Sequence, residues 1–297
     1  MEIAEIAKEF VSGQKLYQQR AIKVLPILVR QAQAAQKIYY SDLATEINIP
    51  NPRNLNYVLG SIGNALIKLG ESMKIEIPPI QCLVVNKHTE LPGEGISWFI
   101  KDVKEFKKLN SRQKKAVLDN ILAKIYAFAK WNEVLEQLGL KPIGPEGVIE
   151  SIVKKATSRG SVGESIHHKE LKEQISKNPQ IIGVNLTPVN VEVEYLFPSA
   201  DTMDISFKNK NHWIGAEVKS HISDDADILR GLYQCVKYKS LMEAHSNVMN
   251  ETTIKEIRVI LALGGEFPDS LMPVKNILGV EVIDNIEQLN APSESGS

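Results

Sequence analysis

The pattern of hydrophobic and polar positions divides the chain into a helical first part and a later part in which helices and strands alternate. Apolar residues recur at helical spacing from Glu2 to Ala35 and from Leu55 to Leu69, which predicts amphipathic helices. Between them, Tyr40 to Pro50 predicts a short helix capped by Ser41, and a Pro-containing turn follows. A short helix, a turn and a second helix form a helix-turn-helix, whose second helix commonly contacts DNA.

A compact β-branched run, Ile80 to Val85, is followed by a turn rich in Gly and Pro, Leu91 to Gly95, and the two predict a strand and a wing. Residues 101–147 then show a helical apolar stripe that ends in a cluster of glycines and prolines. We therefore expect a winged-helix-like DNA-binding domain over residues 1–100 and a helical linker region over 101–147.

The pattern changes after this cluster and predicts an α/β domain over residues 148–290. Helices are expected from Val148 to Thr157, Glu164 to Ser176 and Asp227 to Ala244. Runs rich in β-branched and aromatic residues predict strands at Val189–Phe197, Thr202–Phe207, His212–Val218, Lys255–Leu263 and Val280–Ile283. Such an order favours a mixed sheet flanked by helices. Residues 291–297 read as a disordered tail.

Composition excludes several classes of protein. The chain of 297 residues is 43% hydrophobic and carries a formal net charge of −1, so it can bury a substantial core. Because no apolar run approaches the ~20 residues of a membrane helix, we expect no membrane partner. The N-terminus lacks the features of a signal peptide, and Cys82 and Cys235 are too far apart to suggest a disulfide framework. The reducing cytoplasm is the expected location.

A local basic segment stands out against the nearly neutral total charge. Between Lys101 and Lys115 the sequence has seven basic and two acidic residues. Such a stripe can contact nucleic-acid phosphates, although a solvated helix face is the alternative. The candidate phosphate contacts in this segment are Lys107, Lys108, Arg112, Lys114 and Lys115.

The chemistry of the chain is concentrated in two expected strands. Asp204 lies thirteen residues before Glu217, which begins the triplet Glu217-Val-Lys219. Side chains alternate along a strand, so Glu217 and Lys219 should share a face, and a hairpin would bring Asp204 beside Glu217. Two carboxylates suit a hard cation such as Mg²⁺. The alternative is an exposed strand with an ion pair, but the apolar flanking residues favour a buried site.

Four motifs follow one another in this part of the chain: Glu164 on a helix, Asp204 on a strand, Glu217-Val-Lys219 on the next strand and Gln234-Cys-Val-Lys-Tyr238 on a later helix. This order resembles the PD-(D/E)xK nuclease superfamily of restriction and RecB-like enzymes. The resemblance covers about residues 150–265 and implies a restriction endonuclease-like fold. It implies Mg²⁺ or Mn²⁺ ligands at Asp204, Glu217, the backbone carbonyl of Val218 and the helix residue Glu164, with Lys219 as the catalytic lysine. Gln234-Cys-Val-Lys-Tyr238 matches the Gln-x-x-x-Tyr helix that flanks the RecB-like site, which places Gln234 and Tyr238 next to the reaction. Met203 replaces the motif's proline, which leaves Asp201 as an alternative ligand.

Other polar residues near these motifs have plainer interpretations. His167 and His168 are expected on the helix surface or against a DNA backbone, because no further zinc ligand has suitable spacing. Arg230 is expected to contact a phosphate or to pair with a nearby aspartate. Cys235 is expected in the core.

The N-terminal region resembles the DNA-binding domain of alkyltransferase-like proteins. The matching segments are Tyr40-Ser-Asp-Leu-Ala-Thr-Glu-Ile47, Val58-Leu-Gly-Ser-Ile-Gly-Asn-Ala-Leu66 and the run from Ile77 to Gly95. Gln81 occupies the position of the family's nucleophilic cysteine, so alkyl transfer is not supported. The resemblance places Tyr57 where a residue inserts between bases, and Arg53 lies nearby as a candidate phosphate contact.

These observations predict a Mg²⁺-dependent DNA endonuclease, of a restriction or defence type by analogy, with duplex DNA as the expected partner. One alternative is a non-catalytic nucleic-acid-binding protein on a nuclease scaffold. Another is a nuclease that acts on RNA or branched DNA. A symmetric homodimer would suit double-strand cleavage, because each chain carries a single predicted site.

Overall fold

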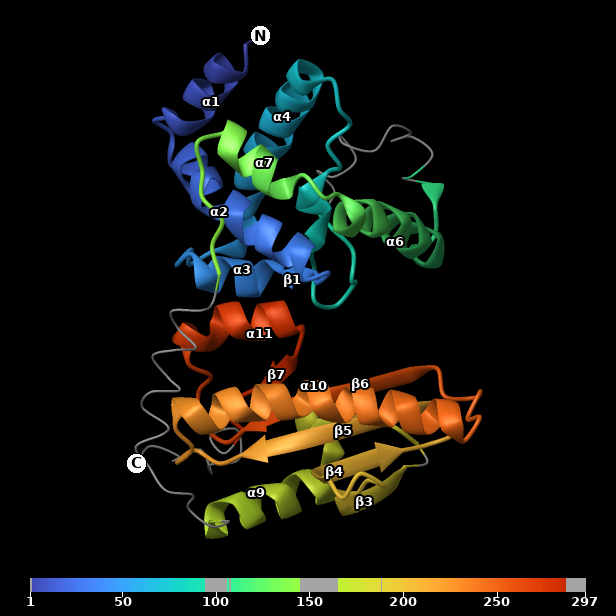
Figure 1. The fold of residues 1–297 in the computed structure, drawn as a ribbon. Helices are drawn as coiled ribbons and strands as arrows, with labels where there is room; N and C mark the ends of the chain where they lie inside the picture. Colours follow the sequence, from blue (N-terminus) through green and yellow to red (C-terminus); the bar gives the residue numbers. More distant parts are fainter. Residues whose placement is uncertain (1, 94–105, 107, 145–164, 188, 287–297) are drawn as a thin grey trace. The chain divides into compact units, whose positions relative to one another are not determined.

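The computed structural model describes residues 2–93, 106, 108–144, 165–187 and 189–286, and the chain divides into two compact units (Figure 1). The first unit comprises Met1–Pro145 and Met272–Gly279, and the second comprises Glu146–Leu271 and Val280–Ser297. The expected helix at Val148–Thr157 and the tail at 291–297 lie outside the described residues. No helix in the described part of the chain combines the length and apolar character needed to span a membrane.

The first unit is mainly helical. Its only β-pairing among the described residues is a short parallel ladder between β1 (Ile38–Tyr39) and β2 (Val84–Val85). Two short 3₁₀ helices accompany it, η1 (Pro52–Asn54) and η2 (Ile80–Leu83). The α-helices described in this unit are α1 (Ile3–Val11), α2 (Leu16–Gln33), α3 (Tyr40–Glu46), α4 (Leu55–Met73), α6 (Ser111–Ala127), α7 (Trp131–Gln137) and α11 (Met272–Leu278).

Two local predictions for this unit are wrong in detail. Ser41 lies inside α3, where its hydroxyl donates to Asp42, and the helix begins after Tyr39 without a side-chain cap. The run Ile80 to Val85 forms a strand only at its end, because its first four residues form η2. Cys82 is therefore buried on a 3₁₀ helix, where desolvation raises the pKa of its thiol.

Helices α6 and α7 contribute to the same core as the first hundred residues. Leu118, Leu122 and Trp131 are buried in one cluster with the inward faces of α2 and α4. The indole N–H of Trp131 donates to the carbonyl oxygen of Ile125 at 2.9 Å, which satisfies its polar atom inside the core. The described part of residues 101–147 is therefore packed into the first unit and does not form a separate linker.

Helix α11 belongs to the first unit although its sequence falls within the expected range of the second domain. The buried side chains of Arg30 and Glu46 form a bidentate ion pair, with N–O distances of 2.6 and 2.9 Å. Asn276 of α11 donates to the same carboxylate at 3.0 Å, and its carbonyl accepts from Gln31 at 2.9 Å. Charge pairing and hydrogen bonding together compensate the burial of these groups, which ties α11 to α2 and α3.

The second unit is built on a mixed five-stranded sheet with the order β3-β4-β5-β6-β7. The first three strands are antiparallel, and β5, β6 and β7 are parallel. The prediction of a mixed sheet flanked by helices is therefore confirmed. Helix α9 (Ile166–Lys177) packs on β3, β4 and β5, whereas α10 (Asp225–Val248) packs on β5 and β6. The strands are β3 (Asn190–Leu196), β4 (Thr202–Lys208), β5 (His212–Lys219), β6 (Glu256–Leu263) and β7 (Glu281–Ile283).

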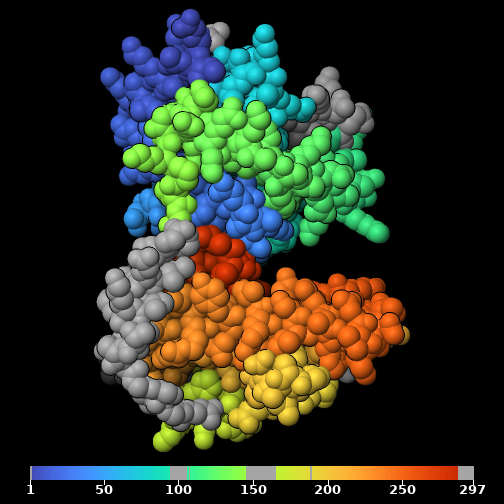
Figure 2. Space-filling view, in the orientation of Figure 1, coloured from blue at the N-terminus to red at the C-terminus, as the bar shows by residue number. Residues whose placement is uncertain are grey.

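The alternation of side chains along β5 separates the core from the polar residues. Ile214, Ala216 and Val218 are buried in one cluster with Leu171 and Ile175 of α9. Because successive residues of a strand point to opposite faces, Glu217 and Lys219 project from the other face. That face is covered by α10, which Figure 1 draws across the sheet and whose outer surface is visible in Figure 2.

Candidate functional site

Asp204 and Val218 meet where the β4–β5 hairpin opens. A turn closed by the Asn209 side chain, which accepts the backbone N–H groups of Asn211 and His212 at 2.9 Å, joins the two strands. Their ladder runs back from this turn to Ile205, which pairs with Ala216. One residue further on, the Asp204 carboxylate accepts the backbone N–H of Val218 at 2.8 Å. The Asp204 side chain therefore takes the place of a backbone acceptor, and this hydrogen bond holds its carboxylate beside β5.

Glu217 and Lys219 lie on one face of β5, as strand alternation predicted, and they form a largely buried ion pair. Their Oε1 and Nζ atoms are 2.7 Å apart, and Glu217 is only 3% exposed. Burial, followed by the charge of Asp204, raises the pKa of Glu217 to about 7, although the charge of Lys219 opposes the shift. Asp204 and Glu217 are therefore close enough for their charges to interact.

Two side chains of α9 contact Asp204 that the sequence analysis did not place there. His168 Nε2 lies 3.3 Å from Asp204 Oδ1, and the nearly buried Lys172 has its Nζ 3.8 Å from the same oxygen. Lys172 also pairs with Glu194 of β3 at 3.0 Å. The assignment of His168 to a helix surface or a DNA backbone is therefore wrong, although its i, i+4 spacing from Lys172 was a visible sign that both lie on one side of the helix.

The surroundings of Asp204 keep its carboxylate ionised, and the neighbouring strand β3 departs from regular geometry opposite this residue. Burial alone would raise the pKa of Asp204, but hydrogen bonds from His168 and from the Val218 N–H, together with the charge of Lys219, bring it below its usual value. Glu194 lies across from Asp204 on strand β3 and adopts a positive φ of 57°. The β3–β4 ladder pairs before and after it, Val193–Ile205 and Tyr195–Met203, are regular. Backbone conformations of this kind cost free energy, and they cluster at functional sites.

The Gln234 and Tyr238 pair extends this cluster onto α10. Gln234 Oε1 accepts from Lys219 Nζ at 3.2 Å, and Gln234 Nε2 lies 3.5 Å from the Tyr238 hydroxyl. Tyr238 in turn donates to the carbonyl oxygen of Thr202 at 2.7 Å, at the first residue of β4. A chain of contacts therefore runs from Glu217 to the start of the strand that carries Asp204.

Close packing of α10 on the sheet depends on Gly231. A Cβ atom at this position would lie 2.8 Å from Leu261 Cδ1 and 3.1 Å from Lys219 Cε. Glycine therefore lets the helix approach the Lys219 side chain closely.

At the start of the helix, the Asp224 side chain caps the N–H groups of Ala226 and Asp227 at 3.0 Å.

The remaining candidates near the motifs have other ion-pair partners, lie in the core or fall outside the described residues. The alternative ligand Asp201 pairs instead with Lys237 at 2.6 Å, and Arg230 pairs with Asp227 at 2.6 Å. Cys235 is buried, as expected for a core residue. Glu164, the expected helix ligand, lies outside the described residues.

The two carboxylates fit a divalent cation by their chemistry. Asp204 and Glu217 supply hard oxygen donors, and the raised pKa of Glu217, which burial and Asp204 cause, reports negative charge that a cation would relieve. Within the described ranges, no group of three or more His, Cys, Asp or Glu side chains is arranged to hold a metal ion. Among the described residues, Asp204 and Glu217 are therefore the two carboxylate donors that the cluster offers to a cation.

The first unit places the expected nucleic-acid contacts at its surface. Tyr57, on the first turn of α4, is 73% exposed, and Arg53 is exposed in η1 immediately before that helix. Arg112 and Lys115 are exposed on α6, whereas Lys114 is half-buried over the Phe106 ring at 5.9 Å. Lys108 is also exposed, and Lys107 lies outside the described residues.

The start of α6 is electrostatically unusual. Asn110 caps the helix in a reciprocal capping box with Gln113, at 3.0 Å in each direction, and the first turn contains no acidic residue. Arg112 and Lys114 instead place positive charge at the positive end of the helix dipole, which is unfavourable for folding. The same arrangement attracts anions.

Comparison with known proteins adds no relative: no family model, no curated protein and no solved structure matches this chain.

Proposed function

We propose that this protein is a metal-dependent nuclease that hydrolyses phosphodiester bonds in DNA. The observation that carries the proposal is the placement of Asp204 and Glu217 on neighbouring strands, with Lys219 bonded to Glu217 and to Gln234. Two interacting carboxylates and a lysine form a donor set suited to a divalent cation and to the charge that develops on a phosphate.

Asp204 and Glu217 would hold Mg²⁺ or Mn²⁺, and the PD-(D/E)xK resemblance adds the Val218 carbonyl and Glu164 to the ligands. Bound in this way, the ion would polarise the scissile phosphate and make a water more acidic. The ammonium group of Lys219 would orient the attacking water and offset charge on the phosphate. Gln234 and Tyr238 would keep Lys219 in position through the contacts at 3.2 and 3.5 Å.

DNA binding would rest largely on the first unit. Phosphate contacts supply most of the affinity of DNA-binding proteins, and base contacts add specificity. The exposed Arg53, Arg112 and Lys115 are candidates for phosphates, with Lys107, Lys108 and Lys114 from the same basic segment, and Tyr57 is exposed where it can insert between bases. A symmetric homodimer would present one site to each strand of a duplex.

The test is cleavage of plasmid DNA with Mg²⁺ or Mn²⁺ by wild type, Lys219→Ala and Asp204→Asn. We expect each variant to lose about 100-fold or more in rate. Asp201→Asn tests the alternative ligand, and Lys239→Ala is the matched control, because Lys239 is exposed on α10 and pairs with Glu243 at 3.9 Å. Loss of activity in Asp201→Asn would move the metal ligand to that residue.

Single-stranded DNA, branched DNA and RNA, tested in parallel, define the substrate. Faster cleavage of RNA or of a junction would replace duplex DNA as the substrate while leaving the proposed site intact. If the folded protein binds duplex DNA tightly but cleaves none of these substrates with either metal, the nuclease proposal is overturned in favour of a binding module.

A further inference from the structure

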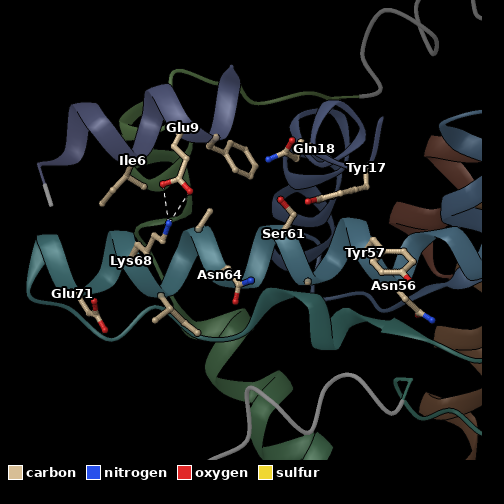
Figure 3. Close-up of a pocket in the computed structure, with 14 residues that line it drawn as sticks. Ile6, Glu9, Tyr17, Gln18, Asn56, Tyr57, Ser61, Asn64, Lys68 and Glu71 are labelled. Atoms are coloured by element: carbon tan, nitrogen blue, oxygen red, sulfur yellow. Dashed lines mark hydrogen bonds and ion pairs between the residues drawn. The ribbon is translucent and has the colours of Figure 1, made fainter. Parts of the chain in front are cut away.

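A groove lies in the first unit, whereas the carboxylate cluster belongs to the second. Its volume is about 650 Å³, within the ordinary range for small-ligand sites. Figure 3 shows α1 running beside α4, with Tyr17 and Gln18 at one end of the groove and the Glu9–Lys68 bridge across it. The floor is formed by α4, the helix expected to face DNA.

The charges that line the groove disfavour a phosphate. Lys68 Nζ contacts both carboxylate oxygens of Glu9, at 2.8 and 2.9 Å, so its charge is matched within the protein. Glu71 adds a further negative charge to the lining. Among the described residues that line the groove, positive charge is therefore not in excess, and a neutral ligand fits better than an anion.

The groove combines neutral hydrogen-bonding groups with aromatic rings. Asn56, Ser61 and Asn64 of α4 contribute two amides and a hydroxyl. Tyr57 is 73% exposed, and its ring centroid lies 6.2 Å from that of Tyr17. Amide side chains match the donor and acceptor edges of nucleobases, and exposed tyrosine rings are stacking surfaces for them.

We propose that the α1–α4 groove binds a single nucleoside unit, with the base stacked on Tyr57 and its polar groups bonded further along α4 to Ser61 and Asn64. The groove has the volume for a ligand of nucleotide size, whereas α1 beside α4 prevents a duplex from entering it. This inference deepens the DNA-binding part of the proposed function and rests on it. The base comes either from an unpaired strand of DNA or from a free nucleoside, and the two sources are separable by experiment.

The experiment measures binding to the full chain in EDTA, so that cleavage does not contribute. A fluorescently labelled ten-nucleotide single strand and a matched duplex are titrated by anisotropy, and the four deoxynucleosides are tested by saturation-transfer NMR. The variants are Asn64→Ala, Tyr57→Ala and Tyr57→Phe. Asn120→Ala is the control, because Asn120 is an exposed asparagine on α6 outside the groove.

We expect Asn64→Ala to weaken binding of the single strand or the nucleoside about fivefold, the value of one neutral hydrogen bond. Tyr57→Ala should weaken it about tenfold through lost stacking, while Tyr57→Phe should retain most of the affinity. Asn120→Ala should bind as wild type does. Asn64 and Tyr57 are exposed on α4, so none of these changes is expected to disturb folding.

Binding of a nucleoside that depends on Asn64 supports the proposal with a free ligand. Binding of the strand alone supports it with an unpaired base when Asn64→Ala and Tyr57→Ala weaken that binding. The proposal is overturned if neither ligand binds, if only the duplex binds, or if Asn64→Ala and Tyr57→Ala both bind as wild type does. Failure of the nuclease function would appear separately, as lack of cleavage with Mg²⁺ while binding in EDTA is unchanged.

Discussion

The backbone N–H of Val218 donates to the Asp204 carboxylate at 2.8 Å, immediately beyond the last ladder pair of β4 and β5. The bond satisfies both groups. The Val218 N–H has no backbone acceptor in the β4–β5 ladder, and the largely buried carboxylate requires a hydrogen-bond donor. Burial would raise the pKa of Asp204, but this bond and the one from His168 bring it below its usual value. The bond thus keeps an ionised carboxylate beside Glu217.

Glu217 should make the stability of the protein depend on pH. Burial and the Asp204 charge raise its pKa to about 7 in the folded state, so the folded protein keeps this proton to higher pH than the unfolded chain does. The free energy of unfolding should therefore fall as pH rises from about 5 to about 8, by on the order of 2 kcal/mol from this group. Urea unfolding at several pH values measures the slope, and Glu217→Gln should flatten it. An unchanged slope in that variant would refute the assignment.

Divalent cations should stabilise the fold through the same carboxylates. Mg²⁺ binds ionised ligands, so the rise in the thermal midpoint on adding Mg²⁺ should be larger near pH 8 than near pH 6. Chelation with EDTA should reverse the rise. Asp204→Asn should abolish it, whereas Asp201→Asn should retain it because Asp201 pairs with Lys237. An equal rise in wild type and Asp204→Asn would place the cation elsewhere.

Tyr238→Phe should weaken both stability and the proposed activity. The change removes the hydroxyl that donates to the carbonyl of Thr202 at 2.7 Å, and the loss of one such hydrogen bond costs about 1 kcal/mol. Gln234 also loses a contact, so cleavage should slow by about a fewfold through looser positioning of Lys219. Tyr233→Phe, on the exposed side of the same helix, is the control and should change neither the urea midpoint nor the cleavage rate.

Arg112→Glu should stabilise the protein while it weakens DNA binding. A carboxylate in the first turn of α6 would interact favourably with the helix dipole, where wild type has no acidic residue, and should add about 0.5 kcal/mol. Loss of one phosphate contact should reduce the salt dependence of DNA affinity by about one unit of slope. Lys124→Glu, in the last turn of α6, should instead destabilise the helix without changing that slope. If Arg112→Glu leaves DNA affinity and its salt slope unchanged, this residue does not contact phosphate.

Strands and long helices of the second unit were predictable because their signals are local. The run His212 to Val218 is mostly apolar, which is typical of a buried strand, and β5 extends only one residue beyond it. The spacing of Gln234 and Tyr238 places both on one side of any helix, and they do contact each other at 3.5 Å on α10. Asp204, Glu217 and Lys219 could be grouped in advance for the same reason, since hairpin pairing and strand alternation follow from sequence spacing.

Contacts between elements distant in sequence were not predictable in this way. The approach of His168 and Lys172 to Asp204 depends on how α9 packs against β4, which no spacing within the helix specifies. The position of helix α11 was not predictable for the same reason. Its seven residues lie within the expected range of the second domain, but its Asn276 bonds to Gln31 and Glu46 of the first unit.

The sequence by itself determined the strands β3 to β7, the long helix α10 and the candidate set Asp204, Glu217 and Lys219, because hydrophobic periodicity and side-chain alternation act over a few residues. Only the tertiary structure decided that Val218 would bind Asp204, that α9 would supply His168 and Lys172, and that α1 would lie beside α4 to form a groove. These outcomes depend on the packing of whole surfaces, and the packing free energy is summed over many weak contacts between residues far apart in the chain.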